Sequence, residues 1–147
     1  MYLDDLTIGM PIDIPATLMD KEEMLDFARR YDPIPLHCDE EYAKTTKFGG
    51  LIAPGVLSFL AVWAKFIEND IFGAELVAGK SIKIEWYLPV YAGDTLKGEG
   101  RVTNLTRRNP YNGIVEVTID VFNQTGQRVL RNVTEAILRY RSPEDVQ

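Results

Sequence analysis

One short segment carries the residues of this sequence that are best suited to catalysis. Tyr31 to Glu40 reads YDPIPLHCDE and holds the only histidine and the only cysteine of the chain. Asp32 and His37 can form an acid/base pair, since a histidine side chain titrates near neutral pH. In an extended chain the two side chains would lie roughly 15 Å apart, so the segment must fold back for them to meet. Pro33 and Pro35 fix φ at two positions and therefore favour such a bend.

Taken alone, a histidine near an aspartate is more typical of a surface loop or of a hydrogen-bonded core histidine. The two prolines favour acid/base chemistry, because that chemistry requires a rigid backbone around both titratable groups. Cys38 follows His37 directly, and neighbouring side chains of an extended segment face opposite ways. A nucleophilic or metal-binding role for Cys38 beside His37 is therefore disfavoured. One cysteine makes neither an internal disulfide nor a zinc site, and we expect no metal and no cofactor.

Composition places the chain among ordinary globular proteins. Hydrophobic residues make up 46% and charged residues 26% of 147 residues, so we expect a single domain over residues 1–147. The net charge of −6 disfavours nucleic acid and anionic membranes as partners. The acidic start does not resemble a signal peptide, and the longest apolar run, Leu51 to Ala64, is too short for a membrane span. We therefore predict a soluble, cytoplasmic protein.

The first half of the sequence predicts one edge strand and three helices. Residues 11–18 alternate in polarity and contain two prolines, which suits an edge strand. Residues 20–31 predict a helix that ends where Asp32 precedes a proline. A short helix is expected over residues 39–48. Residues 54–69 predict a longer helix that is apolar on every side and hence buried.

The second half predicts an antiparallel sheet. Polarity alternates along four segments, and hairpin turns are expected at Asn112–Gly113 and Thr125–Gly126. The four segments are residues 80–88, 95–105, 114–122 and 128–140. We predict an α+β hot-dog arrangement, in which a meander of these four strands and a fifth, N-terminal strand wrap around the long buried helix. An N-terminal helical overhang would carry the active-site loop, and the open sheet edges favour pairing with a second copy.

Several motifs resemble those of the MaoC-like dehydratases and (R)-specific enoyl-CoA hydratases. That family carries an Asp-x-Asn-Pro-aliphatic-His signature followed by a small residue. The residues of this chain at those positions are Asp32, Pro35, Leu36, His37 and Ala43. The block Phe48 to Leu57, the segment YLPVYAGDTLKGEGRV and the hairpin FNQTGQRVLRNVTEAIL resemble further family motifs, so the resemblance covers about residues 6–140. Ile34 departs from the signature, which usually has asparagine there.

The resemblance implies a hydro-lyase. It would reversibly hydrate a trans-2-enoyl-CoA to an (R)-3-hydroxyacyl-CoA, or dehydrate a related hydroxyacyl thioester, without a cofactor. Asp32 and His37 would activate water, and the backbone N–H of Gly55 at the start of the buried helix would bind the enolate oxygen. A structural role for Gly55, as space for helix packing, is the alternative. The expected partners are an acyl-CoA or acyl carrier protein thioester and a second copy, as a homodimer or a dimer of dimers.

Further residues are candidates for substrate binding. They are Pro54, Ile34, Ser58, Arg107 and Arg108. The two arginines could meet the phosphates of coenzyme A, although such residues more commonly form a solvated face. Ser58 lies one turn into the helix, where bonding back to the helix backbone is the more common role. Trp63, Trp86 and Tyr87 are expected in the walls of the acyl tunnel.

Two alternative functions stay open. A thioesterase on the same fold would place a carboxylate on the central helix or a histidine just before it. Residues 55–66 contain no acid, and His37 lies further upstream, which disfavours this alternative. A non-catalytic subunit that binds acyl thioesters is favoured by Ile34 and disfavoured by the intact pair of Asp32 and His37.

Overall fold

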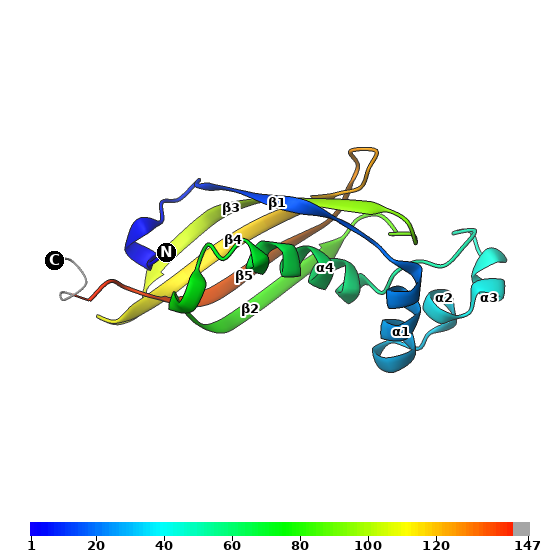
Figure 1. Cartoon of the computed structure of the whole chain (residues 1–147), viewed down its shortest axis with the longest axis horizontal. Helices are drawn as coiled ribbons and strands as arrows, with labels where there is room; N and C mark the ends of the chain where they lie inside the picture. Colours follow the sequence, from blue (N-terminus) through cyan, green and yellow to red (C-terminus); the bar gives the residue numbers. More distant parts are fainter. Residues whose placement is uncertain (143–147) are drawn as a thin grey trace.

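A single antiparallel sheet organises the chain in the computed structural model, which describes residues 1–142. Its strands lie in the order β1-β3-β4-β5-β2 (Figure 1). The strands are β1 (Pro11–Leu18), β2 (Leu76–Trp86), β3 (Thr95–Arg107), β4 (Asn112–Phe122) and β5 (Arg128–Arg139). The predicted alternation is clearest in β4, where Val115, Val117, Ile119 and Val121 face the core and are buried. The edge strand predicted over residues 11–18 is confirmed as β1.

The strand order corrects one part of the prediction. Only β3, β4 and β5 form a meander, because β2 pairs with β5 at the far edge and β1 takes the place beside β3. The connection over residues 87–94 is not a hairpin. Val90 O accepts the N–H of Ala53 at 2.7 Å, and Met19 O accepts the N–H of Gly93 at 2.8 Å. These bonds hold the connection against the segments before α4 and after β1. The connection therefore crosses the end of the sheet, and β3 begins next to β1.

The turn predicted at Asn112–Gly113 lies elsewhere. These two residues begin β4, and the turn precedes them. Asn109 makes this turn, because its Oδ1 accepts the N–H groups of Tyr111 at 2.8 Å and Asn112 at 2.9 Å. The second predicted turn is confirmed, with Gly126 at φ +79° between β4 and β5.

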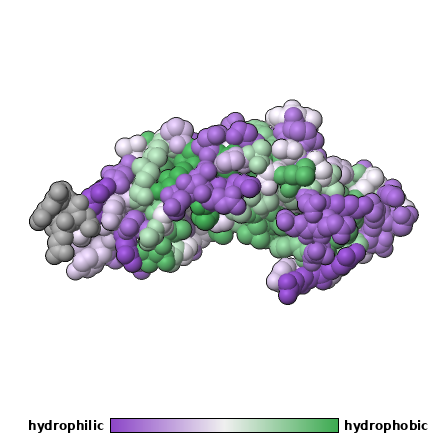
Figure 2. Space-filling view, viewed as in Figure 1, coloured by the Kyte–Doolittle hydropathy of each residue, from purple (hydrophilic) through white to green (hydrophobic). Residues whose placement is uncertain are grey.

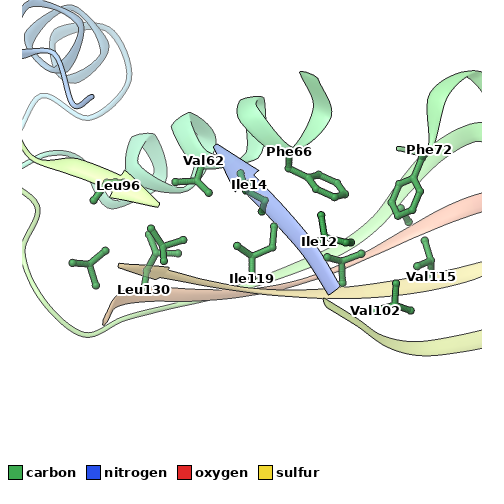
Figure 3. Close-up of a cluster of buried hydrophobic side chains, with 14 of the residues drawn as sticks. Ile12, Ile14, Val62, Phe66, Phe72, Leu96, Val102, Val115, Ile119 and Leu130 are labelled. Carbon is green, nitrogen blue, oxygen red and sulfur yellow. The ribbon is translucent and has the colours of Figure 1, made fainter. Parts of the chain in front are cut away.

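Helix α4 (Gly55–Glu68) lies along one face of the sheet and forms the core with it (Figure 1). Val62 and Phe66 of the helix are 1% and 2% exposed. They pack over Ile14 of β1, Leu96 of β3 and Ile119 of β4, as Figure 3 shows. Apolar side chains of three strands therefore pack under α4 and hold the helix against the sheet.

The prediction that α4 is buried on every side is wrong for one stripe. Val56, Leu60 and Ile67 are 47%, 40% and 43% exposed. Residues spaced by four and seven share one helix face, so these three side chains form a continuous stripe. The helix packs against β1 and β3, and a single five-stranded sheet covers only one side of it. We refer to these residues as the α4 stripe.

Three short helices form an overhang beside the sheet (Figure 1). They are α1 (Lys21–Tyr31), α2 (Pro35–Cys38) and α3 (Glu40–Lys44), and 3-10 turns occur at Leu3–Asp5 and Gly73–Glu75. Asp20 caps α1 by accepting the N–H of Glu23 at 3.0 Å, as the sequence predicts. Leu25, Ala43 and Leu51 form a small separate core under the overhang. No helix among residues 1–142 is long and apolar enough to cross a membrane.

Candidate active site

The overhang brings Asp32 and His37 together. Asp32 Oδ2 lies 3.5 Å from His37 Nε2. The histidine side chain is 9% exposed and the aspartate side chain is 41% exposed. His37 is therefore buried, whereas Asp32 reaches solvent. The predicted bend that brings residues 32 and 37 together is present.

The fold-back has a local cause in the segment between α1 and α2. The N–H of Ile34 donates to Asp32 O at 2.9 Å, which turns the chain around Pro33. Pro35 then opens α2, a position where its missing N–H costs nothing. Ile34 O accepts the N–H of His37 at 3.0 Å, so one helical turn carries the imidazole back toward the aspartate.

A backbone carbonyl fixes the orientation of the imidazole. His37 Nδ1 lies 2.8 Å from Ile52 O. A carbonyl oxygen can only accept a hydrogen bond, so Nδ1 carries the proton and Nε2 of the neutral ring is left with a lone pair. Nε2 and a carboxyl oxygen of Asp32 can then both accept a hydrogen bond. A water molecule that donates one hydrogen to each of them would satisfy both groups.

The start of α4 lies beside this pair. Gly55 opens the helix after Pro54, and the N–H groups of Gly55 and Val56 have no acceptor within the described part of the chain. Pro54 O instead accepts the N–H groups of Leu57 at 3.0 Å and Ser58 at 3.2 Å. Free N–H groups and the helix dipole make this end a favourable place for a developing negative charge.

A cavity of about 430 Å³ joins the pair to the helix start. Asp32, His37, Gly55 and Ser58 line it together with residues from the connection after β2. Most of the remaining wall is apolar, formed by Phe48, Ile52, Val56, Trp86, Leu88 and Val90. No lysine or arginine belongs to the lining that the structure describes. The cavity therefore offers an apolar wall to a ligand and polar groups at one end.

The sequence matches the family model "MaoC like domain" over residues 5–125. The chain belongs to this family. An (R)-specific enoyl-CoA hydratase from Rhodospirillum rubrum is 32% identical over 108 residues, which cover 71% of each chain. The structure of a MaoC-like dehydratase from the same organism is 28% identical with a TM-score of 0.87, covering 97% of this chain and 99% of that one. A protein from Archaeoglobus fulgius described as a monoamine oxidase regulatory protein is 27% identical with a TM-score of 0.91, covering 97% and 96%.

These similarities confirm the predicted family and hot-dog fold. The departure from the MaoC signature at Ile34 leaves the polar end of the cavity intact. The Ile34 side chain is 47% exposed and does not line the cavity. Its contribution is made by the backbone, since its carbonyl accepts the N–H of His37 and the Sγ–H of Cys38, the latter at 3.2 Å.

The predicted arginines lie far from this site. Arg107 of β3 is aligned with Gly113 of β4. Gly113 is aligned in turn with Leu138 of β5, and Leu138 with Leu76 at the start of β2. Trp86, in the cavity wall, stands ten positions further along β2, on the order of 30 Å away. The structure therefore does not bring Arg107 and Arg108 together with Asp32 and His37. Neither arginine lines this cavity.

The predicted tunnel walls are partly present. Trp86 and Tyr87 line the cavity, whereas Trp63 packs inside the helix layer, its ring 4.9 Å from that of Phe66. Pro54 serves as the N-cap residue of α4 and is not part of the lining. The role of Ile52 is not predictable from the sequence, because its backbone carbonyl makes the contact and every residue type supplies one. Leu88 and Val90 were not predicted as lining residues either, and they reach the cavity through the β2–β3 connection.

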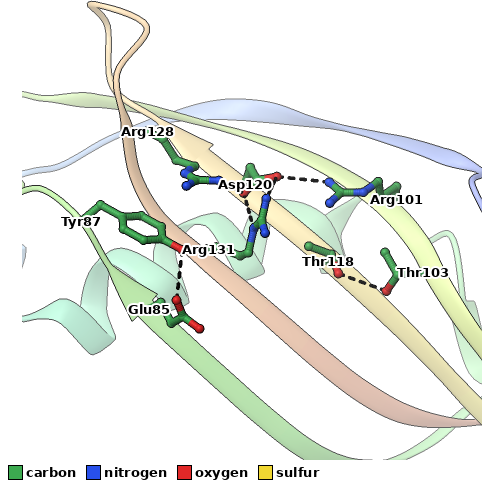
Figure 4. A network of polar contacts seen from close by, with 8 residues as sticks. All are labelled: Glu85, Tyr87, Arg101, Thr103, Thr118, Asp120, Arg128 and Arg131. Atoms are coloured by element: carbon green, nitrogen blue, oxygen red, sulfur yellow. Dashed lines mark hydrogen bonds and ion pairs between the residues drawn. The ribbon is translucent and has the colours of Figure 1, made fainter.

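Charged side chains gather on the opposite face of the sheet from α4 (Figure 4). Asp120 accepts hydrogen bonds from Arg131 at 2.7 Å and 3.2 Å, from Arg101 at 3.1 Å and from Arg128 at 3.3 Å. Burial of Asp120 opposes its ionisation, but the bonds from Arg131 and Arg101 outweigh this effect and hold its pKa below the usual range. The Arg128 guanidinium lies 4.3 Å from the centre of the Tyr87 ring, which links this network to the cavity wall.

Proposed function

We propose that the protein reversibly hydrates a trans-2-enoyl thioester to the (R)-3-hydroxyacyl thioester. The observation that carries this proposal is the geometry of His37, with Nδ1 bonded to Ile52 O at 2.8 Å and Nε2 turned to Asp32 at 3.5 Å. The (R) configuration is carried over from the hydratase that is 32% identical. Asp32, His37 and Gly55 are the proposed catalytic residues.

The pair performs the proton transfers of the reaction. A water held between Asp32 and His37 Nε2 loses a proton to one of them while its oxygen attacks C3 of the enoyl group. The electron pair of the C2=C3 bond moves toward the thioester carbonyl and forms an enolate. The proton then returns to C2, and the thioester carbonyl re-forms. The added atoms are those of one water molecule, so the reaction needs no further reactant.

The helix start stabilises the enolate. The free N–H of Gly55 points out of the first turn of α4, where the helix dipole adds positive potential. Donors of this kind act most strongly in a cavity that excludes water, and the wall here is largely apolar. The apolar wall would receive the acyl chain. Coenzyme A is the proposed carrier, and an acyl carrier protein thioester is the alternative.

We propose that a second copy of the chain completes the molecule as a homodimer. Strand β2 lies at a sheet edge, and Val77, Ile82 and Trp86 on it are 49%, 55% and 51% exposed. The unpaired N–H and C=O groups of an edge strand are a ready template for pairing. The α4 stripe is exposed as well, and Figure 2 shows hydrophobic surface over the middle of this face beside the hydrophilic overhang. Pairing of two β2 edges would extend the sheet and bring two apolar surfaces together.

The test is a pair of assays on the purified protein with crotonyl-CoA and a longer 2-enoyl-CoA. Loss of the absorbance of the conjugated thioester reports hydration, and a thiol reagent reports hydrolysis. We expect the absorbance to fall without release of thiol, and the product to be the (R) enantiomer. Release of thiol would show a thioesterase instead. Binding of both substrates without either change would show a subunit that only binds acyl thioesters.

A further inference from the structure

Ser58 differs from the other buried polar side chains. The residue is 1% exposed, and its Oγ is the one buried side-chain nitrogen or oxygen without a hydrogen-bond partner over residues 1–142. A helical serine ordinarily donates a hydrogen bond to the carbonyl four residues back, and this is the more common role for a serine at this place in the sequence. Here that carbonyl belongs to Pro54, and it accepts only backbone N–H groups.

An unpaired buried hydroxyl destabilises the folded chain, and an alanine at the same place would avoid that cost. Ser58 also lines the cavity that contains Asp32 and His37. The solvent-accessible area of Oγ is below 1 Å², so the hydroxyl reaches a group in the cavity only when the side chain turns about its Cα–Cβ bond. Such a turn would give the hydroxyl a partner that it lacks within the described part of the chain.

The position of Ser58 on α4 indicates which group that is. Ser58 follows Gly55 by three residues, so the two lie on the same helix face. Helical side chains lean toward the helix N-terminus, which directs this one toward the first turn. The free N–H of Gly55 opens at that same turn.

We propose that the Ser58 hydroxyl is a second hydrogen-bond donor, beside the Gly55 N–H, to the thioester oxygen as it becomes an enolate. This inference rests on the proposed function of the site. During addition of water to C3, the electron pair of the C2=C3 bond moves onto this oxygen. The hydroxyl donates a hydrogen bond to it and keeps its own proton. When C2 is protonated, the carbonyl re-forms and the bond weakens.

The variants Ser58→Ala and Ser58→Cys separate catalysis from structure. In the hydration of crotonyl-CoA we expect Ser58→Ala to lower kcat by about 100-fold or more with KM changed by less than about 3-fold. The thiol of Ser58→Cys is a weaker hydrogen-bond donor of similar shape, so the kcat of this variant should lie between those of the wild type and Ser58→Ala. The Tm of Ser58→Ala should equal or exceed that of the wild type, because no hydrogen bond is lost.

Ser81→Ala is the matched control for stability. The Ser81 hydroxyl donates to Glu135 Oε1 at 2.6 Å on an exposed strand. Removing a paired hydroxyl should leave Tm unchanged or lower it, whereas removing the unpaired Ser58 hydroxyl should not lower it. A purely structural Ser58 would show the reverse pattern, with a lower Tm and an unchanged kcat, and that result would overturn the proposal.

A second measurement does not depend on turnover. Acetoacetyl-CoA forms an enolate with its own absorbance, and donors to its thioester oxygen favour that form. We expect the wild type to bind it as the enolate and Ser58→Ala to lose at least about tenfold of that signal. Equal signals in both would overturn the Ser58 proposal even if the wild type hydrates crotonyl-CoA. A Ser58-dependent signal without hydration would support the proposal and contradict the proposed reaction. Neither hydration nor enolate binding by the wild type would overturn both.

Discussion

At the scale of single residues, Gly55 has a packing role in addition to its proposed N–H. A Cβ atom at Gly55 would lie 2.5 Å from both Cε2 and Nε1 of Trp86. No real Cβ approaches a ring so closely, so a side chain at position 55 would have to displace the Trp86 ring. Trp86 is also part of the cavity wall. Gly55 therefore provides space for packing, which is the structural role that the sequence leaves open, and it does so beside the cavity where its N–H is proposed to act.

We expect Gly55→Ala to lower kcat/KM of the hydration reaction by about 10–100-fold, because the new methyl group displaces the Trp86 ring from the cavity wall. The N–H donor itself is retained in this variant. Steady-state kinetics with crotonyl-CoA measure the effect.

The double variant Gly55→Ala/Trp86→Leu provides the control, since the smaller side chain leaves room for the methyl group. We expect it to recover part of the lost activity relative to Gly55→Ala. A double variant no more active than Gly55→Ala would contradict the packing role and would indicate that the ligand itself needs the space.

At the scale of elements, features with a local cause are predictable from the sequence, whereas features that depend on long-range contacts are not. The cap at Asp20 and the alternation of β4 are readable because their causes lie within a few residues. The pairing of β2 with β5 depends on where the connection over residues 87–94 is anchored, which no local pattern records. The same limit applies to the site. Asp32 and His37 are predictable from their types and prolines, whereas the Ile52 carbonyl is found only from the fold.

The charge network on the sheet gives a prediction about stability and pH. We expect Asp120→Asn to lower the free energy of unfolding at pH 7 by about 1–3 kcal/mol, since three arginines lose their shared carboxylate. The folded-state pKa of Asp120 lies below its ordinary value of 3.8, so its contribution is complete above that value. It is lost as the pH falls through the folded-state pKa. Denaturant unfolding at pH 7 and at a series of lower pH values measures the difference.

Glu99→Gln is the matched control, because Glu99 is the exposed register partner of Asp120 on β3. Its effect should stay within about 0.5 kcal/mol at every pH. A difference between wild type and Asp120→Asn that persists unchanged at the lowest pH would contradict the assignment of the effect to the ionised carboxylate.

At the scale of the whole molecule, each of the two exposed apolar surfaces reaches the cavity at one end. Trp86 belongs to the β2 edge and Val56 to the α4 stripe, and both line the cavity. A second copy placed on these surfaces would adjoin the site. The apolar periodicity of residues 54–69 predicts a covered helix but does not say which chain covers it, and this is why the exposed stripe is not foreseen.

Leu60→Glu tests the proposed dimer. Leu60 is 40% exposed in one chain, so a charge there should leave the fold intact. In a dimer it would replace buried leucines in both copies, and we expect the dimer dissociation constant to rise at least about 100-fold. Analytical ultracentrifugation measures the mass and circular dichroism checks the fold. Ile8→Glu, at a side chain that is 65% exposed outside both surfaces, should leave the mass unchanged. A monomeric wild type, or a dimer unaffected by Leu60→Glu, would contradict the proposed interface.

The central claim is that Asp32 and His37 act as one unit on water. The most direct measurement is kcat for hydration of crotonyl-CoA by Asp32→Asn, His37→Gln and the double variant. Each single variant should lose about 10²–10⁴-fold, and the double variant should be little worse than either, because removal of one member already disables the pair. Single variants that retain wild-type kcat, or losses that multiply in the double variant, would contradict the claim.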